Sequence, residues 1–246
     1  MATHFARGTF NPDHLISPRL TANDHTTARQ LPEHRRHRFL ASRSLLAELM
    51  FMLYGCHELP PVVHDDRGRP HFRDAGLADF SFSYAGNMVG VALATEGGCG
   101  LGMELQRATR AFHHPHAPQP ASGLTSNETI WIANQNDPTE ATSQLLTLRR
   151  SLLKLTGYPQ QEMQLLPGAG RLRVASTPNI EAVCDAEDVL VWAVASTPAM
   201  DKLRIWEFDM QRGWKSLPDA QKRCQSADAR LMRFTSLPVE KALILN

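Results

Sequence analysis

The segment NDPTEATSQLLTLRRSLLKLTG, residues 136–157, constrains the fold most strongly because both of its ends carry helix signals. Asp137 suits an N-cap, and Pro138 suits the first helical position after it. Glu140 stands where it would close a capping box, and Gly157 suits a helix stop. The leucines between these ends recur at helical spacing: Leu145, Leu148, Leu152 and Leu155. The segment therefore predicts a long helix that buries one face.

A second long helix is predicted from Leu31 to Tyr54. Pro32 suits its first turn and Gly55 its end. Its apolar residues recur at intervals of three and four: Phe39, Leu40, Leu45, Leu46, Leu49, Met50 and Leu53. The opposite face carries HRRHR and then Arg43, a basic strip whose simplest interpretation is a solvated helix face.

Several short stretches read as strands. FSFSYAG and MVGVALAT predict a hairpin with Gly86 and Asn87 at its turn. GLGMELQ, residues 100–106, is an apolar ribbon with the single carboxylate of Glu104, and VLVWAVA and KLRIWEF predict strands further on. Together with the two helices, these runs predict an α+β protein.

Composition excludes some partners. The 246 residues hold 26 basic and 25 acidic side chains, so no global field favours nucleic acid or an anionic membrane, and phosphate recognition must be local. No run approaches the roughly 18 apolar residues of a membrane span. The cysteines lie far apart without paired spacing, which is typical of cytoplasmic thiols: Cys56, Cys99, Cys184 and Cys224.

Three histidines cluster in the proline-containing stretch RAFHHPHAPQPASG: His113, His114 and His116. A metal site there would need a fixed helix or hairpin to present the imidazoles. The prolines instead favour a long surface loop.

Five stretches taken in order, RRHRFLASRSLL, GRPHF, FSFSYAG, GLGMELQ and LTLRRSLLKLTG, resemble the 4'-phosphopantetheinyl transferase superfamily in its large, two-lobed, surfactin-synthetase-priming form. The resemblance covers about Leu31 to Gly157. It implies two similar lobes, residues 1–99 and 100–246, each a small antiparallel sheet packed on a long helix and related by a pseudo-two-fold axis. It also implies a monomer, while the lack of a signal peptide and of a membrane span predicts a cytoplasmic protein.

The activity that the resemblance implies is transfer of the 4'-phosphopantetheine arm of coenzyme A to a serine of an acyl or peptidyl carrier protein, with release of adenosine 3',5'-bisphosphate. Coenzyme A and the carrier protein are the implied partners, with no nucleic acid and no membrane. In the family, a Gly-Ile-Asp-Ile-Glu strand and a Trp-x-x-Lys-Glu helix supply three carboxylates around Mg²⁺, which bridges the coenzyme A diphosphate.

This sequence departs from the metal motif. Glu104 matches the glutamate of the strand, but Gly102 stands at the aspartate position. Arg150 stands at the glutamate position of the helix, where an arginine repels a divalent cation. The resemblance therefore implies a metal site reduced to Glu104, and magnesium binding of the family type is not expected.

The remaining matches assign catalytic residues and residues that bind coenzyme A. The resemblance implies Glu104, Arg150 and Lys154 as catalytic residues. It implies that coenzyme A is bound by Arg43, Arg69, Ser83, Tyr84 and Arg149, with Tyr84 standing at a family histidine and Leu146 at the family tryptophan.

These departures leave three interpretations open. Arg150, held by Glu104, takes the place of the cation beside the diphosphate, and transfer or coenzyme A binding continues. Alternatively, the chain is a catalytically degenerate module that binds coenzyme A or a carrier protein. In the third interpretation, Arg149, Arg150 and Lys154 are a solvated helix face.

Overall fold

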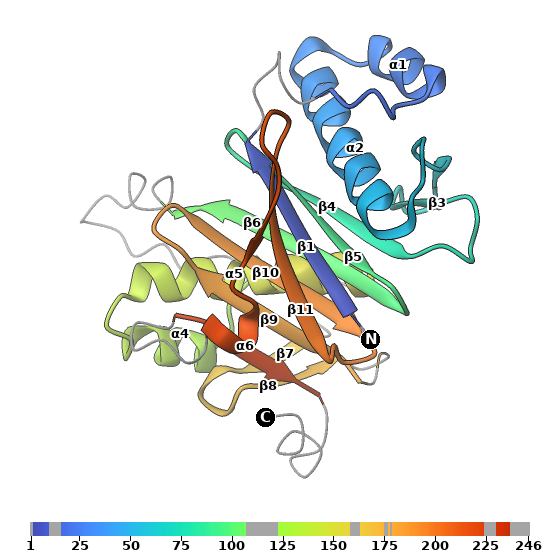
Figure 1. The fold of residues 1–246 in the computed structure, drawn as a ribbon. Coiled ribbons are helices and arrows are strands. Elements are labelled where there is room, and N and C mark those ends of the chain that lie inside the picture. Colours follow the sequence, from blue (N-terminus) through green and yellow to red (C-terminus); the bar gives the residue numbers. More distant parts are fainter. Residues whose placement is uncertain are drawn as a thin grey trace.

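The computed structural model describes residues 2–9, 16–106, 123–157, 163–174, 177, 179–223 and 230–236. The fold is α+β, as predicted, with two large sheets, a small β hairpin and packed helices (Figure 1). The histidine cluster at residues 113–116 and Cys224 lie outside the described residues.

The first large sheet has five strands in the order β12-β11-β1-β5-β4. Their bounds are β1 Ala2–Thr9, β4 Asp79–Ala85, β5 Met88–Ala94, β11 Lys202–Asp209 and β12 Gly213–Leu217. β4 and β5 form the predicted hairpin, in which Ala85 opposes Met88. Gly86 at the turn has a φ of 59°, a conformation that favours glycine.

The second large sheet has six strands in the order β6-β10-β9-β13-β8-β7. Their bounds are β6 Gly98–Leu105, β7 Met163–Leu166, β8 Arg171–Val174, β9 Glu181–Ala186, β10 Leu190–Thr197 and β13 Met232–Thr235. The predicted strands in GLGMELQ and VLVWAVA are β6 and β10. A short 3-10 helix, η2 Pro167–Ala169, separates β7 from β8, and α6 spans Ala220–Arg223.

The prediction of purely antiparallel sheets was wrong. β1 pairs with β11 in parallel, and β13 pairs with β8 in parallel. The first pairing joins strands about 200 residues apart in the sequence, so nothing local in either strand indicates its direction.

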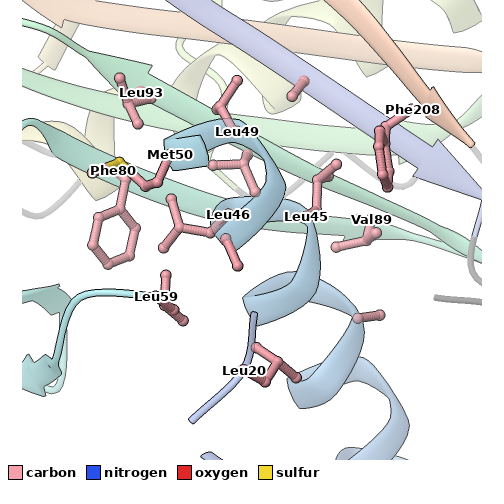
Figure 2. Close-up of a cluster of buried hydrophobic side chains, with 14 of the residues drawn as sticks. Leu20, Leu45, Leu46, Leu49, Met50, Leu59, Phe80, Val89, Leu93 and Phe208 are labelled. Atoms are coloured by element: carbon pink, nitrogen blue, oxygen red, sulfur yellow. The ribbon is translucent and has the colours of Figure 1, made fainter. Parts of the chain in front are cut away.

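The helix α2, Glu33–Tyr54, covers the five-stranded sheet and confirms the second predicted helix. Its buried face packs on side chains of β4, β5 and β11, as Figure 2 shows: Leu45, Leu46, Leu49 and Met50 against Phe80, Val89, Leu93 and Phe208. The shorter α1, Ala22–Arg29, and the hairpin of β2 Val62–His64 and β3 Pro70–Phe72 flank this helix.

The helix α5, Pro138–Thr156, packs on β6, β10 and β9, with α4, Ser126–Ala133, beside it. Asp137 caps α5 as predicted by accepting from the Glu140 amide at 2.9 Å. The structure records only this half of the predicted capping box, because the Glu140 carboxylate instead accepts from Gln106 Nε2 at 2.6 Å. Gly157 ends the helix with a φ of 69°.

The two large sheets share a buried core, in which the rings of Phe5 in β1 and Trp192 in β10 lie 5.0 Å apart, and they also meet at two edge strands. β4 is an edge strand of the five-stranded sheet, β6 is an edge strand of the six-stranded sheet, and the two strands lie in contact. β11 and β12 belong to the sheet of β1, although both follow residue 100, the predicted lobe boundary. That boundary stays a prediction.

Candidate functional site

Polar side chains of β4 bind the backbone of β6. Asp79 Oδ2 accepts from the Cys99 amide at 2.8 Å, and Ser81 Oγ accepts from the Leu101 amide at 3.1 Å. Because side chains alternate along a strand, Asp79, Ser81 and Ser83 all point to this side, while Phe80 and Phe82 pack toward α2. We call this contact the β4–β6 seam. At this seam, side-chain oxygens of β4 accept hydrogen bonds from the edge amides of β6, in place of the carbonyl oxygens of a neighbouring strand.

Lys154 of α5 joins both strands of the seam. Its Nζ donates to Phe82 O at 2.7 Å, Leu101 O at 2.8 Å and Ser83 Oγ at 3.3 Å. Burial of the ammonium group and the nearby charge of Arg150 lower the pKa of Lys154 to about 8. The predicted residues Lys154 and Ser83 are therefore brought together.

Arg69 reaches the same seam from the turn between β2 and β3. Its Nη2 donates to Asp79 Oδ2 and to Cys99 O, the latter at 3.1 Å. The turn is held by Asp65, whose Oδ1 accepts from the Arg69 amide at 2.8 Å and the Arg67 amide at 3.0 Å. Asp79, the first residue of β4, therefore fixes the position of the Arg69 guanidinium.

A cleft of about 440 Å³ opens between this turn, β4 and the C-terminal end of α5. Among the described residues, Arg67, Arg69 and Lys154 line it together with Asp65, while Phe80, Phe82, Leu153 and Pro70 give it an apolar wall. Arg67, Arg69 and Lys154 face two carboxylates, Asp65 and the Asp79 partner of Arg69, so the cleft keeps a positive balance beside aromatic surface. This suits an anionic ligand that also carries an apolar part.

Glu104 and Arg150 form an ion pair beyond the seam. Arg150 Nη1 donates to Glu104 Oε2 at 2.5 Å, and the side chains are 49% and 23% exposed, respectively. A β carbon at Gly102 would lie 2.3 Å from the carbonyl oxygen of Thr147 in α5. Glycine at this position therefore lets α5 approach β6 more closely than any other residue would.

These residues do not fit a magnesium site. Within the part of the chain that the structure describes, no group of three or more His, Cys, Asp or Glu side chains is placed to hold a metal ion. Glu104 is engaged by a cation, and its neighbour on the same strand face is Gly102. Mg²⁺ held through carboxylates would need at least a second one here.

Arg43 is buried on α2 with 4% of its surface exposed, between the rings of Phe39 and Phe82 at 5.0 and 5.6 Å. Its Nη1 is buried and has no hydrogen-bond partner among the described residues. Burial lowers the pKa of the guanidinium, and Asp24 and Tyr84 oppose that shift. A buried cation with an unpaired donor is costly unless an anion completes its contacts.

Tyr84 follows Ser83 on β4 and is half-exposed beside α2. Arg38 lies 6.0 Å above its ring. Burial raises the pKa of Tyr84, while a hydrogen bond with Ser42 and the charges of Arg43 and Arg38 act in the opposite direction. Tyr84 therefore lies near Arg43, on the α2 side of β4.

Arg149 is not part of this group. Its side chain is 2% exposed, and its Nη2 donates to both oxygens of the buried Glu128 of α4, at 2.7 and 2.8 Å. The sequence carries a signal for this placement, because Arg149 lies four residues after Leu145 and three before Leu152, on the buried stripe of α5. The structure gives Arg149 a role in joining α4 to α5.

Sequence reasoning also missed Asp79 and Ser81, which fix Arg69 and β6. Polar residues at positions 79, 81 and 83, alternating with Phe80 and Phe82, were the available signal. Arg67, in the predicted turn, was missed because its placement beside Gly157 depends on tertiary structure.

Among the described residues, no helix has the length and apolar character that crossing a membrane requires.

Two curated relatives match the whole chain. It is 59% identical over 250 residues to a protein of Escherichia coli strain K12 named "Uncharacterized protein YieE", and the alignment covers 100% of both chains. The protein of the same name from Escherichia coli O6:H1 strain CFT073 matches with the same identity and coverage. No family model matches the chain. Identity at this level over the full length shows the family: the chain belongs to the YieE family.

Proposed function

We propose that this protein binds coenzyme A in the cleft beside the β4–β6 seam and transfers its 4'-phosphopantetheine arm to a serine of a carrier protein. The observation that carries the proposal is the lining of the cleft, in which Arg69 and Lys154 stand beside the apolar wall of Phe80 and Phe82. Two cations suit a diphosphate, and an aromatic wall suits an adenine ring or the pantetheine chain.

Arg43 supports the same ligand. Its Nη1 has no partner among the described residues, and its guanidinium carbon lies 5.6 Å from the centre of the Phe82 ring. Phe82 lines the cleft, and its main-chain carbonyl accepts from Lys154. Coenzyme A carries a 3'-phosphate in addition to its diphosphate, so a second cationic position near the first is what this ligand requires. Ser83 adds a hydroxyl next to Lys154.

In the proposed reaction the serine oxygen of the carrier protein attacks the phosphorus that bears the pantetheine arm. The bond from that phosphorus to the bridging oxygen breaks, and adenosine 3',5'-bisphosphate leaves with both electrons of the bond. The serine proton passes to solvent water, because Glu104 is engaged by Arg150 and poorly placed to accept it. The expected transfer is therefore slow.

That same ion pair favours a second candidate function. If no group accepts the serine proton, the protein is a catalytically degenerate module that binds coenzyme A or a carrier protein. Both functions use the same cleft, and they differ only in turnover.

We also propose that the two halves of the molecule are related by a pseudo-two-fold axis. The strand order β1-β5-β4, with α2 packed on it, matches the order β6-β10-β9, with α5 packed on it, and this supports the proposal. We further propose a cytoplasmic monomer. The unpaired thiols of Cys56, Cys99 and Cys184 support a reducing compartment.

The test is mass spectrometry of an apo carrier protein incubated with coenzyme A and the purified protein. Transfer predicts a mass gain of one phosphopantetheine arm, lost in Arg69→Ala and kept in Arg212→Ala, which removes an exposed arginine of the β11–β12 turn. Saturable coenzyme A binding without a mass gain would support the binding module. Neither binding nor mass gain would contradict both functions.

A further inference from the structure

α5 carries two cationic side chains here: Lys154, which lines the cleft, and Arg150, whose charge acts on Lys154. Arg150 and Lys154 lie four residues apart on one face of α5, about 6 Å along the helix axis. Glu104 is the single acidic partner that the described residues give them. Two cations and one carboxylate leave a net positive charge, which an anion would neutralise.

The backbone of α5 excludes the carboxylate that a metal site would need at Gly102. A β carbon there would lie 2.3 Å from Thr147 O, and one at Gly100 would lie 2.0 Å from Ser151 O. Both obstacles are main-chain atoms of a helix, which cannot rotate away as a flexible side chain does. The close approach of α5 therefore requires glycine at these two positions of β6. Glycine there supplies no carboxylate for a metal ion.

The Arg150 guanidinium has donors left for an anion. Nη1 is held by Glu104, and within the described ranges the structure records no partner for Nε or Nη2. The side chain is half-exposed, so these donors reach solvent. A guanidinium fixed at one nitrogen presents its other N–H groups in a defined plane, which suits two phosphate oxygens.

We propose that Arg150, held by Glu104, binds the diphosphate of coenzyme A in the place of a divalent cation, so that ligand binding requires no metal ion. This inference rests on the proposed function, because Arg150 lies beside Lys154, which lines the cleft. Glu104 acts here as a positioning residue that fixes the guanidinium, and Lys154 contributes the second charge.

The experiment is calorimetric titration of the whole protein with coenzyme A, in excess EDTA and again in excess Mg²⁺. The wild-type protein is expected to bind equally under both conditions. Arg150→Ala is expected to bind about tenfold more weakly or worse, the cost of a lost charge-assisted contact. Arg212→Ala removes an equal charge from an exposed turn and serves as the matched control, with unchanged affinity. Thermal unfolding of each variant checks that it is folded.

Arg150→Glu sharpens the test, because it places a second carboxylate beside Glu104. This variant is expected to lose coenzyme A binding in EDTA and to regain it in Mg²⁺, since two carboxylates and a diphosphate suit that ion. Failure of Mg²⁺ to restore binding would argue against Arg150 standing in the cation's place.

The outcomes separate the two proposals. Binding that appears only with Mg²⁺, or an Arg150→Ala variant that binds as tightly as the wild type, overturns the metal-free inference and leaves the proposed function standing. No coenzyme A binding under either condition overturns both.

Discussion

At the residue scale, the main finding is that neighbouring cations of one helix have different surroundings. Arg149 is buried against Glu128, Arg150 is half-exposed beside Glu104, and Lys154 binds two main-chain carbonyls across the seam. The directions of successive side chains along a helix differ by about 100°. Adjacent arginines therefore lie on different faces, and only the second is available to a ligand.

The charge of Arg150 should be measurable in the titration of Lys154. The wild-type ammonium is expected to titrate with a pKa of about 8. Arg150→Ala removes a nearby positive charge, which favours the protonated form, so the pKa of Lys154 should rise toward its ordinary value. An NMR titration of the Lys154 Cε signal measures this. A pKa that does not rise would mean that Arg150 is too well screened to act on Lys154, and Arg212→Ala should change nothing.

The same pKa predicts how coenzyme A binding depends on pH. As pH rises through about 8, the ammonium of Lys154 loses its proton and one positive charge leaves the cleft. Affinity for an anion should therefore fall above that pH and be steady just below it. Titrations across this range test the sign, and Lys154→Met should show weaker binding without this step. An affinity that increases above pH 8 would contradict the assignment.

At the element scale, the close packing of α5 on β6 determines what the site can contain. The glycines at positions 100 and 102 bring the helix backbone against the strand. The caps at Asp137 and Gly157 and the leucine stripe made this helix predictable from its own sequence. Its distance from β6 was not predictable, because it depends on glycines in a different element.

Gly102→Ala should destabilise the protein by about 2 to 4 kcal/mol, since its new methyl group meets a main-chain oxygen. Gly168→Ala is the matched control, because a β carbon at Gly168 has its nearest neighbour at 3.8 Å. That variant should change the free energy of unfolding by less than about 0.5 kcal/mol. Urea denaturation compares them. Equal effects of the two substitutions would mean that α5 shifts easily.

The buried pair of Arg149 and Glu128 predicts a stability effect without a binding effect. Arg149→Ala leaves Glu128 buried and uncompensated, and should cost about 3 to 5 kcal/mol of unfolding free energy. Arg150→Ala should cost less than about 1 kcal/mol, because its pair is half-exposed. Urea denaturation measures both. Where Arg149→Ala remains folded, its coenzyme A affinity should equal that of the wild type. A large loss of affinity would mean that Arg149 belongs to the ligand site.

At the scale of the whole molecule, the site exists because two sheets meet at β4 and β6. The two long helices α2 and α5, the Gly86 turn and most strands of the site could be predicted from local caps and periodicity. The parallel pairing of β1 with β11, and the use of Asp79 and Ser81 to bind β6, could not. Both depend on segments distant in sequence, and alternation along β4 indicates only that one face is polar.

The seam itself is testable through Ser81. Ser81→Ala leaves the Leu101 amide without its acceptor and should cost about 1 to 3 kcal/mol. Hydrogen exchange at Leu101 should become faster, whereas Ser216→Ala, on exposed β12, should leave it unchanged. Unchanged exchange at Leu101 in Ser81→Ala would mean that the two edges are held by other contacts.

The central claim is that the cleft beside the β4–β6 seam binds coenzyme A through its phosphates. The most direct measurement is a crystal structure of the protein with coenzyme A. We expect the diphosphate beside Arg69, Lys154 and Arg150, and the 3'-phosphate on the unpaired nitrogen of Arg43. Coenzyme A bound elsewhere, or a cleft that stays empty at saturating ligand, would contradict the claim.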